Sequence, residues 1–203
     1  KVWNVNVDGT FNLLSAMNQS GVTSLVYASS IVAPRGHGWH RATPDELPYL
    51  PMDDEYPFWA GVEEAYTLSK QLNELTVRMF ANRGLLHSAT ALRIAQVGNA
   101  SEANGPGALH TENPSWTLVD VKDVAQAFRL AVEKQLPGHQ AFFIGSRYRY
   151  RADGERQTPA ETRAELAAAG LGNVPEKPGF LQEWQAIATS ERAENMLGYN
   201  PHY

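Results

Sequence analysis

The 203-residue chain contains no cysteine. This absence excludes disulfide scaffolds, thiolate metal sites and cysteine nucleophiles, and it agrees with a reducing cytoplasm, where we expect the protein. The chain also lacks any apolar run near the roughly 18 residues that a membrane-spanning helix needs, so no membrane partner is expected. Basic charge is not in excess, because the formal net charge is −5. A nucleic-acid partner normally requires a basic face, so nucleic-acid binding is not expected either.

The composition is that of a folded globular protein. Hydrophobic residues make up 43% of the chain and charged residues 19%, which is typical of globular chains and not of disordered ones. A chain of this length can bury a core without the help of a metal or a disulfide. We expect one main domain with a small appendage, divided into residues 1–146 and 147–203.

Helical and strand-like patterns alternate along the chain. Apolar residues at three- and four-residue spacings predict helices, and short apolar runs between polar residues predict buried strands. The expected helices are residues 2–19, 62–82, 120–134, 159–169 and 181–197, and the expected strands are residues 25–28, 88–94, 116–119 and 140–144. This alternation predicts an α/β fold, in which helices pack on a doubly wound parallel sheet.

Two long segments interrupt this alternation. Prolines recur through residues 33–59 and exclude regular elements there. Loops of such length inside compact domains tend to be lids or binding segments. A second expected loop, residues 99–114, is rich in Gly, Asn and Pro. Within the expected helix 62–82, the apolar residues form one stripe, at Ala65, Leu68, Leu72, Leu75 and Met79.

Tyr66 and Lys70 are four residues apart in this helix. The spacing places both side chains on one face, one turn apart. A lysine ammonium beside a phenol stabilises the phenolate, so Tyr66 could take a proton from a hydroxyl or give one to a carbonyl. The same spacing is common on exposed helix faces, where it has no chemical role.

A pair of serines favours the chemical interpretation. Ser29 and Ser30 end the expected strand at residues 25–28, and ligands of parallel sheets bind beyond the carboxyl ends of the strands. A serine at that place can hydrogen-bond the oxygen that Tyr66 protonates or deprotonates. Taken alone, the pair would be interpreted as a turn or a cap.

The motifs resemble those of the extended short-chain dehydrogenase/reductase superfamily, and within it the NAD-dependent epimerase/dehydratase family. They follow one another in the family's order over nearly the whole chain. The matching segments are NVDGTFNLL at 6–14, LVYASS at 25–30, YLPMDDE at 49–55, YTLSK at 66–70 followed by Glu74, LR at 92–93, DVKDVA at 120–125 and MLGYNP at 196–201. The resemblance implies a Rossmann-like fold and NAD or NADP as the cofactor.

The resemblance also implies roles for single residues. Ser30 would orient the substrate oxygen, Tyr66 would be the general acid and base, and Lys70 would hold the nicotinamide ribose while tuning Tyr66. Beside Tyr66 and Lys70, the implied cofactor contacts are Asn6, Ala28, Ser29 and Val97, and the implied substrate contacts are Ser30 and Gln96. For Asn6, a simple contact at the helix start is an equal alternative.

One family feature is missing. The cofactor fingerprint Gly-x-x-Gly-x-x-Gly, whose backbone approaches the pyrophosphate at a helix N-terminus, does not occur in the chain. The first helix here, which follows Lys1, matches the fourth helix of the family. We therefore expect a Rossmann-like fold that is incomplete at its N-terminus, with an apolar sheet edge at residues 25–28. The resemblance further implies a homodimer that forms through helices 2–19 and 62–82.

Other signals in the sequence are weaker. His37 and His40 flank Trp39, but a third ligand is lacking and no metal site is expected. Trp39 could stack on a sugar ring of the substrate, or it could belong to a solvent-facing lid. The run RYRYR at residues 147–151 predicts an edge strand, and Arg147 is a candidate for binding a substrate phosphate or carboxylate.

The expected function is NAD(P)-dependent epimerisation, dehydration or oxidoreduction at a hydroxyl-bearing carbon of a sugar or nucleotide sugar. A non-catalytic regulatory or interaction protein on a truncated version of the fold is the first alternative. The missing glycine loop favours that alternative, whereas Ser30, Tyr66 and Lys70 disfavour it. A reductase of a non-sugar carbonyl is the second alternative.

Overall fold

The structure is a computed structural model, and it describes residues 1–36, 47–59, 61, 64–98, 118–151, 155–183 and 185–202. His37, Trp39 and His40, which the sequence analysis singled out, lie outside the described residues.

A three-stranded parallel sheet forms the centre of the molecule. Its strands are β1 (Ser24–Ser30), β2 (Ser88–Ile94) and β5 (Gly138–Ile144), in the order β1-β2-β5. Ser30 pairs with Ile94, and Ile94 pairs with Ile144, so all three carboxyl ends meet at one edge. Beyond that edge, β3 (Gln96–Gly98) and β4 (Leu118–Asp120) form a short parallel pair.

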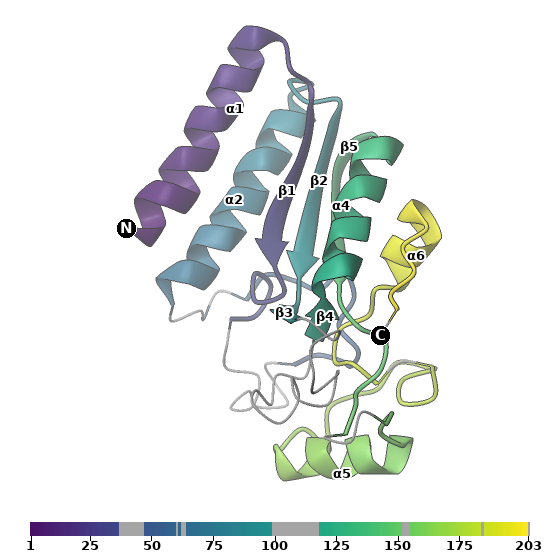
Figure 1. Ribbon diagram of the computed structural model, residues 1–203. Coiled ribbons are helices and arrows are strands. Elements are labelled where there is room, and N and C mark those ends of the chain that lie inside the picture. Colours follow the sequence, from purple (N-terminus) through teal and green to yellow (C-terminus); the bar gives the residue numbers. More distant parts are fainter. Residues whose placement is uncertain are drawn as a thin grey trace.

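Helices cover both faces of the sheet (Figure 1). One face carries α1 (Gly9–Ser20), which continues the π-helical turn η1 (Asn4–Asp8), and α2 (Ala65–Asn82). The opposite face carries α4 (Val121–Lys134). The prediction of a doubly wound, Rossmann-like α/β fold is confirmed. No helix within the described ranges is both long enough and apolar enough to cross a membrane.

The core has two parts, one on each face of the sheet. Between α1, α2 and the sheet, the buried cluster includes Leu14, Val77 and Ala89. A larger cluster lies between the sheet, α4 and the C-terminal segments, and it includes Leu92 and Phe142. The strand β2 is buried on both sides along nearly its whole length, as expected for a central parallel strand.

Two helices follow the sheet. The helix α5 (Pro159–Ala168) begins with a capping box, in which Thr158 and Glu161 satisfy each other's backbone N–H groups. It lies below the sheet, whereas α6 (Glu191–Leu197) returns to pack beside β5 and α4. The division at residue 146 stays a prediction.

The predicted helix 181–197 is wrong over residues 181–183 and 185–190. Of the described residues in this range, only Glu191–Leu197 are helical. Ahead of it, Met52 N donates to Ile187 O at 2.7 Å, and Thr189 N donates to Met52 O at 2.8 Å. These bonds pair residues 187–189 with a distant extended segment, and this tertiary pairing overrides the local helical pattern.

The described part of the proline-rich segment is structural. Leu47, Leu50, Met52 and Tyr56 are buried in the large core. The segment is therefore a core-building strap over residues 47–56, and it does not have the character of a solvent-facing lid there. The run at 147–151 is also not an edge strand, because only Tyr150 forms a bridge, with Arg156.

Candidate functional site

The carboxyl edge of the sheet gathers the residues that the sequence singled out. Ser30 ends β1, while Tyr66 and Lys70 lie in the first two turns of α2, which begins beside this edge. The Tyr66 side chain is 37% exposed and Lys70 is half-buried. A ligand at this edge would therefore reach the phenol from solvent.

Lys70 connects the helix to the strand. Its Nζ donates to the carbonyl oxygen of Ala28 at 2.9 Å and lies 5.7 Å from the ring centre of Tyr66. Burial lowers the pKa of Lys70, because the charged form loses hydration, and the nearby carboxylate of Glu74 opposes this effect. The ammonium is thus held between a strand carbonyl and the phenol.

The two serines of β1 have different environments. Ser30 is half-buried, and its Oγ accepts from the backbone N–H of Val32 at 3.4 Å. Ser29 is buried, and its Oγ donates to Glu74 Oε1 at 2.5 Å. The Ser29 side chain therefore faces α2, and only its backbone is available to a ligand at the sheet edge.

Sequence reasoning did not identify the group that fixes Ser29. Arg93 of β2 donates through Nε and Nη2 to both carboxylate oxygens of Glu74, at 2.9 to 3.3 Å. Its Nη1 donates to the carbonyl oxygen of Asp54 at 2.9 Å. A usable signal was present, because Arg93 is the one charged residue in an otherwise uncharged strand, Ser88–Ile94.

Asn6 connects the first helix to the active face of α2. Its Nδ2 donates to Ser69 Oγ at 2.9 Å, and Ser69 Oγ donates to the carbonyl oxygen of Tyr66 at 2.6 Å. When the Asn73 amide takes the orientation that satisfies both of its ends, its nitrogen also donates to Asn6 O at 2.8 Å. The π-helical turn η1 contains Asn6, and such turns are frequent at functional sites.

The remaining predicted residues are placed differently. Gln96 and Val97 are exposed in β3, next to the sheet edge. Arg147 is ion-paired with Glu194 of α6 and lines a cavity of about 210 Å³ with Tyr148 and Arg156. None of the predicted catalytic residues lines that cavity, so the structure does not bring Arg147 together with Tyr66.

A second cavity, of about 420 Å³, was not predicted from the sequence. Its walls include Asp54, Arg78, Arg93, His139 and Arg192, which come from five separate parts of the chain. Burial raises the pKa of Asp54 to about 7 and lowers the pKa of His139 to about 4. The local sequence around each residue contains no sign of this convergence.

The residues at the sheet edge suit proton transfer to and from an oxygen atom. A phenol beside an ammonium can donate or accept a proton, and a neighbouring serine hydroxyl can orient the reacting group. As a test of cofactor fit, the exposed Tyr66 and Val97 and the half-buried Lys70 offer a ring face, an apolar face and a cation. These groups fit the nicotinamide and ribose end of a dinucleotide, whereas the glycine loop for its pyrophosphate is not in the sequence.

The chain is similar to known proteins in sequence and in fold. A curated relative, short-chain dehydrogenase/reductase family 42E member 1 of Xenopus laevis, is 26% identical over 168 residues, which cover 71% of this chain and 42% of that protein. The solved structure of a UDP-galactose 4-epimerase matches with a TM-score of 0.59 at 20% identity, covering 100% of this chain and 65% of the other. The UDP-glucose 4-epimerase of Thermus thermophilus, solved in complex with NAD, matches with a TM-score of 0.60 at 21% identity, covering 98% and 66%.

The chain spans less than half of the curated relative and about two thirds of these solved structures. The model of the NAD dependent epimerase/dehydratase family matches residues 1–145, which is most of the chain and includes β1, α2, β2 and β5. The chain therefore belongs to the NAD dependent epimerase/dehydratase family.

Proposed function

We propose that the protein to which this chain belongs carries out NAD(P)-dependent epimerisation, dehydration or oxidoreduction at a hydroxyl-bearing carbon of a sugar or nucleotide sugar. The observation that carries the proposal is the position of Lys70 Nζ, 2.9 Å from Ala28 O and 5.7 Å from the Tyr66 ring centre at the carboxyl edge of the sheet. The similarity in fold to a UDP-galactose 4-epimerase and a UDP-glucose 4-epimerase supports the substrate class.

In this proposal, Tyr66 is the general acid and base. Its phenolate accepts the proton of the substrate hydroxyl as a carbonyl forms, and the phenol returns the proton in the reverse step. The ammonium of Lys70 stabilises the phenolate electrostatically, and Ser30 Oγ donates a hydrogen bond to the substrate oxygen. Lys70, with Ala28, Ser29 and Val97, would hold the nicotinamide end of NAD or NADP, which would supply the hydride acceptor and donor that balances this proton transfer.

The remaining site residues serve binding. Ala28, Ser29 and Val97 offer backbone and apolar surface to the nicotinamide, with Asn6 behind the first turn of α2. Gln96 lies exposed beside them, toward the substrate. Residues 1–146 would form the cofactor side and residues 147–203 the substrate side. Trp39 and Arg147 stay candidates for substrate contact. The cysteine-free composition supports a cytoplasmic location.

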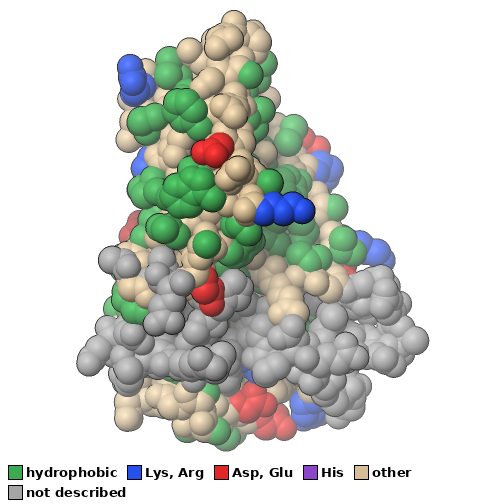
Figure 2. Space-filling view, turned by 90° about the vertical axis from the view of Figure 1, so that its left-hand side faces the viewer, with side chains coloured by type: hydrophobic (Ala, Val, Ile, Leu, Met, Phe, Trp, Pro, Cys, Tyr) green, Lys and Arg blue, Asp and Glu red, His purple; other side chains and the backbone are tan. Residues whose placement is uncertain are grey.

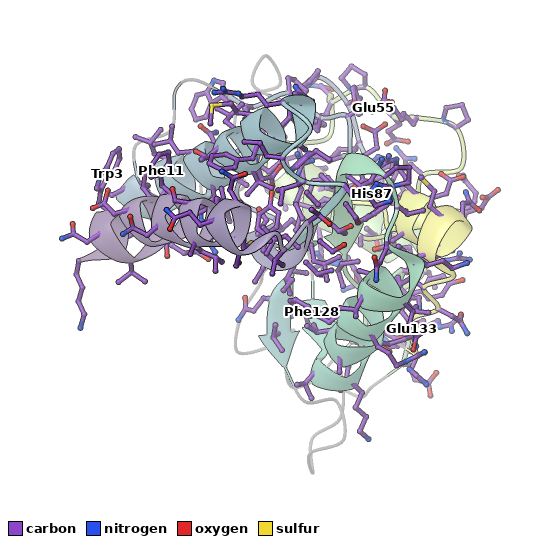
Figure 3. The ribbon with its side chains drawn as sticks, turned by 90° about the horizontal axis from the view of Figure 1, so that it is seen from above. Trp3, Phe11, Glu55, His87, Phe128 and Glu133 are labelled. Carbon is purple, nitrogen blue, oxygen red and sulfur yellow. The ribbon has the colours of Figure 1, made fainter. Side chains whose placement is uncertain are left out.

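The proposal includes a homodimer through α1 and α2. The stripe on α2 that the sequence predicts does not face the sheet, because Leu68, Leu75 and Met79 are exposed. Phe11 of α1 is also 51% exposed. Figure 2 shows hydrophobic side chains gathered on this side of the molecule, and Figure 3 places Trp3 and Phe11 along the first helix, away from Glu133 on α4. A second copy that presents the same face would cover these side chains.

A non-catalytic role on the same fold is the second candidate. The absence of the glycine loop from the sequence favours it. The two candidates differ in what they require of the sheet edge, since only catalysis needs the pairing of Lys70 with Tyr66.

A fluorescence titration with NADH and NADPH, on a sample of confirmed intact mass, separates the two candidates. We expect saturable binding near micromolar, and turnover of a nucleotide-sugar substrate that Tyr66→Phe lowers by about 100-fold or more. Full turnover in Tyr66→Phe would refute the mechanism. The absence of binding at millimolar cofactor would instead favour the non-catalytic candidate for this chain.

A further inference from the structure

A buried ionic network lies directly behind the candidate active face. Glu74 is 0% exposed, Arg93 is 2% exposed and Ser29 is 5% exposed. Glu74 accepts one hydrogen bond from Ser29 and three from Arg93. A single carboxylate therefore connects α2 to both β1 and β2 at the level where the two strands end.

Position along the helix links this carboxylate to the reacting pair. Glu74 follows Lys70 by four residues and Tyr66 by eight, so the three side chains share one side of α2. Lys70 binds the carbonyl of Ala28, and Glu74 binds the side chain of the next residue, Ser29. Side chains from two successive turns of α2 thus hydrogen-bond to two successive residues of β1.

Arg93 of β2 stabilises this contact between α2 and β1. Ser29 and Arg93 are register partners on the adjacent parallel strands. Because they lie side by side, both side chains contact Glu74. The guanidinium lies 5.6 Å from the ring centre of Phe58 and 5.3 Å from that of Phe143. Its remaining donor binds the carbonyl oxygen of Asp54. Arg93 therefore has little freedom, and neither does the carboxylate that it holds.

We propose that Glu74 is a positioning residue, which fixes Lys70 and Tyr66 against the carboxyl end of β1 and places a negative charge on the same side of α2 as the Lys70 ammonium. The inference rests on the proposed function only in naming Lys70 and Tyr66 as the reacting pair. A residue with a purely structural role would hold α2 on the sheet equally well if its charge were replaced by a neutral group of the same shape.

Electrostatics gives the proposal its second support. Lys70 is half-buried and hydrogen-bonded to a neutral carbonyl, so dehydration disfavours its charge. Glu74 is the group that counteracts this loss. Arg93 binds Glu74 directly, at 2.9 Å. Among the described residues, Lys70 also lies over the ring of Tyr66 on α2, and the charge of Glu74 also acts on Tyr27 of β1 and His139 of β5.

The test measures the protonation of Lys70 in the folded chain, without turnover. Lysine labelled with ¹⁵N at Nζ gives five side-chain signals, because the chain has five lysines, and a Lys70→Arg variant assigns the signal of interest. We expect Glu74→Gln to lower the pKa of Lys70. The matched control is Glu133→Gln, which removes the same charge from an exposed pair on α4 and should leave Lys70 unchanged.

A double variant guards against misfolding. Removing one partner of a buried pair leaves the other charge uncompensated, whereas replacing both with apolar residues is far better tolerated. We therefore expect the variant with Glu74→Leu and Arg93→Met to fold, and to show the same downward shift of Lys70. An unchanged Lys70 titration in either folded variant would overturn the proposal. A shift of Lys70 in a protein without turnover would support the positioning role and count against the proposed function.

Discussion

Lys70 and Tyr66 form a cation–ring pair, with the Lys70 Nζ 5.7 Å from the centre of the Tyr66 ring. The pair spans one turn of α2, and the same Nζ is anchored to β1 through the carbonyl oxygen of Ala28. The relative position of the Lys70 ammonium and the Tyr66 ring is thus fixed by α2 and β1.

This pair leads to a prediction for Lys70. Replacing Lys70 with Met removes the charge but keeps the length of the aliphatic stem, so turnover should fall by about 100-fold or more. The unfolding free energy should change by only about 1 kcal/mol, because one hydrogen bond is lost. Initial rates and chemical denaturation measure the two effects. Equal losses of stability and activity would show that Lys70 acts mainly as a structural link.

Asp54 and His139 line one cavity and should shape the pH dependence of stability in opposite directions. The pKa of Asp54 rises from 3.8 to about 7 on folding, so its contribution is present at low pH and is lost as the pH rises to about 7. The pKa of His139 falls from 6.5 to about 4, so its contribution is present above pH 6.5 and is lost as the pH falls to about 4. In the shared interval the two contributions should largely cancel.

Single substitutions should reveal each contribution. Relative to the parent chain, Asp54→Asn should gain stability as the pH rises from about 4 to about 7, with a slope of at most about 1.4 kcal/mol per pH unit. His139→Gln, which keeps a hydrogen-bonding group beside the Tyr27 hydroxyl, should show the opposite slope. Denaturant titrations at several pH values measure both differences. Parallel curves for all three proteins would contradict the assignment.

Asn6 can be tested for its two expected roles. Its amide contacts Ser69 and not the side chains of Tyr66 or Lys70, so we expect Asn6→Ala to cost about 1 kcal/mol of stability and to leave cofactor affinity nearly unchanged. Denaturation and the NADH titration measure these quantities on one sample. A tenfold weaker binding of NADH would instead assign Asn6 to the cofactor.

The dimer should depend on the exposed face of α2. Leu75 and Met79 are 46% and 43% exposed. Burying them between two copies would stabilise the dimer by a free energy that is proportional to the apolar area removed from water. Replacing both with Glu should produce monomers in sedimentation at micromolar concentration. Val132→Glu on α4, which is equally open to solvent, should have no effect. A parent chain that is already monomeric would count against the dimer.

Local patterns predicted much of the fold. The runs that became β1, β2 and β5, and the helices that became α2 and α4, follow from apolar periodicity and from the residues that end each element. Gly21, for example, ends α1 with a φ of 73°, a conformation that glycine adopts readily. The Tyr66 and Lys70 spacing likewise identified the face of α2 that meets the sheet edge.

Long-range contacts account for the errors. Residues 187–189 have helical periodicity but pair with Met52, which no local rule predicts. Arg147 stays a candidate for substrate contact, but the sequence did not predict its ion pair with Glu194 of α6. The apolar stripe on α2 suggests a core face, whereas Leu68, Leu75 and Met79 are exposed and the polar residue Glu74 is fully buried. In each case the deciding partner is more than 15 residues away in the sequence.

The sheet described above also determines how the chain must fold. Within the described part of the chain, β1 pairs only with β2, and β2 pairs with β5, always in parallel. Each pair of strands is therefore separated in the sequence by a segment that contains a crossover helix. The ends of this segment must come together before the strands can hydrogen-bond, and such non-local closure makes folding slow. We expect refolding over milliseconds to seconds, with β1 as the surface most prone to wrong association until its helices have docked.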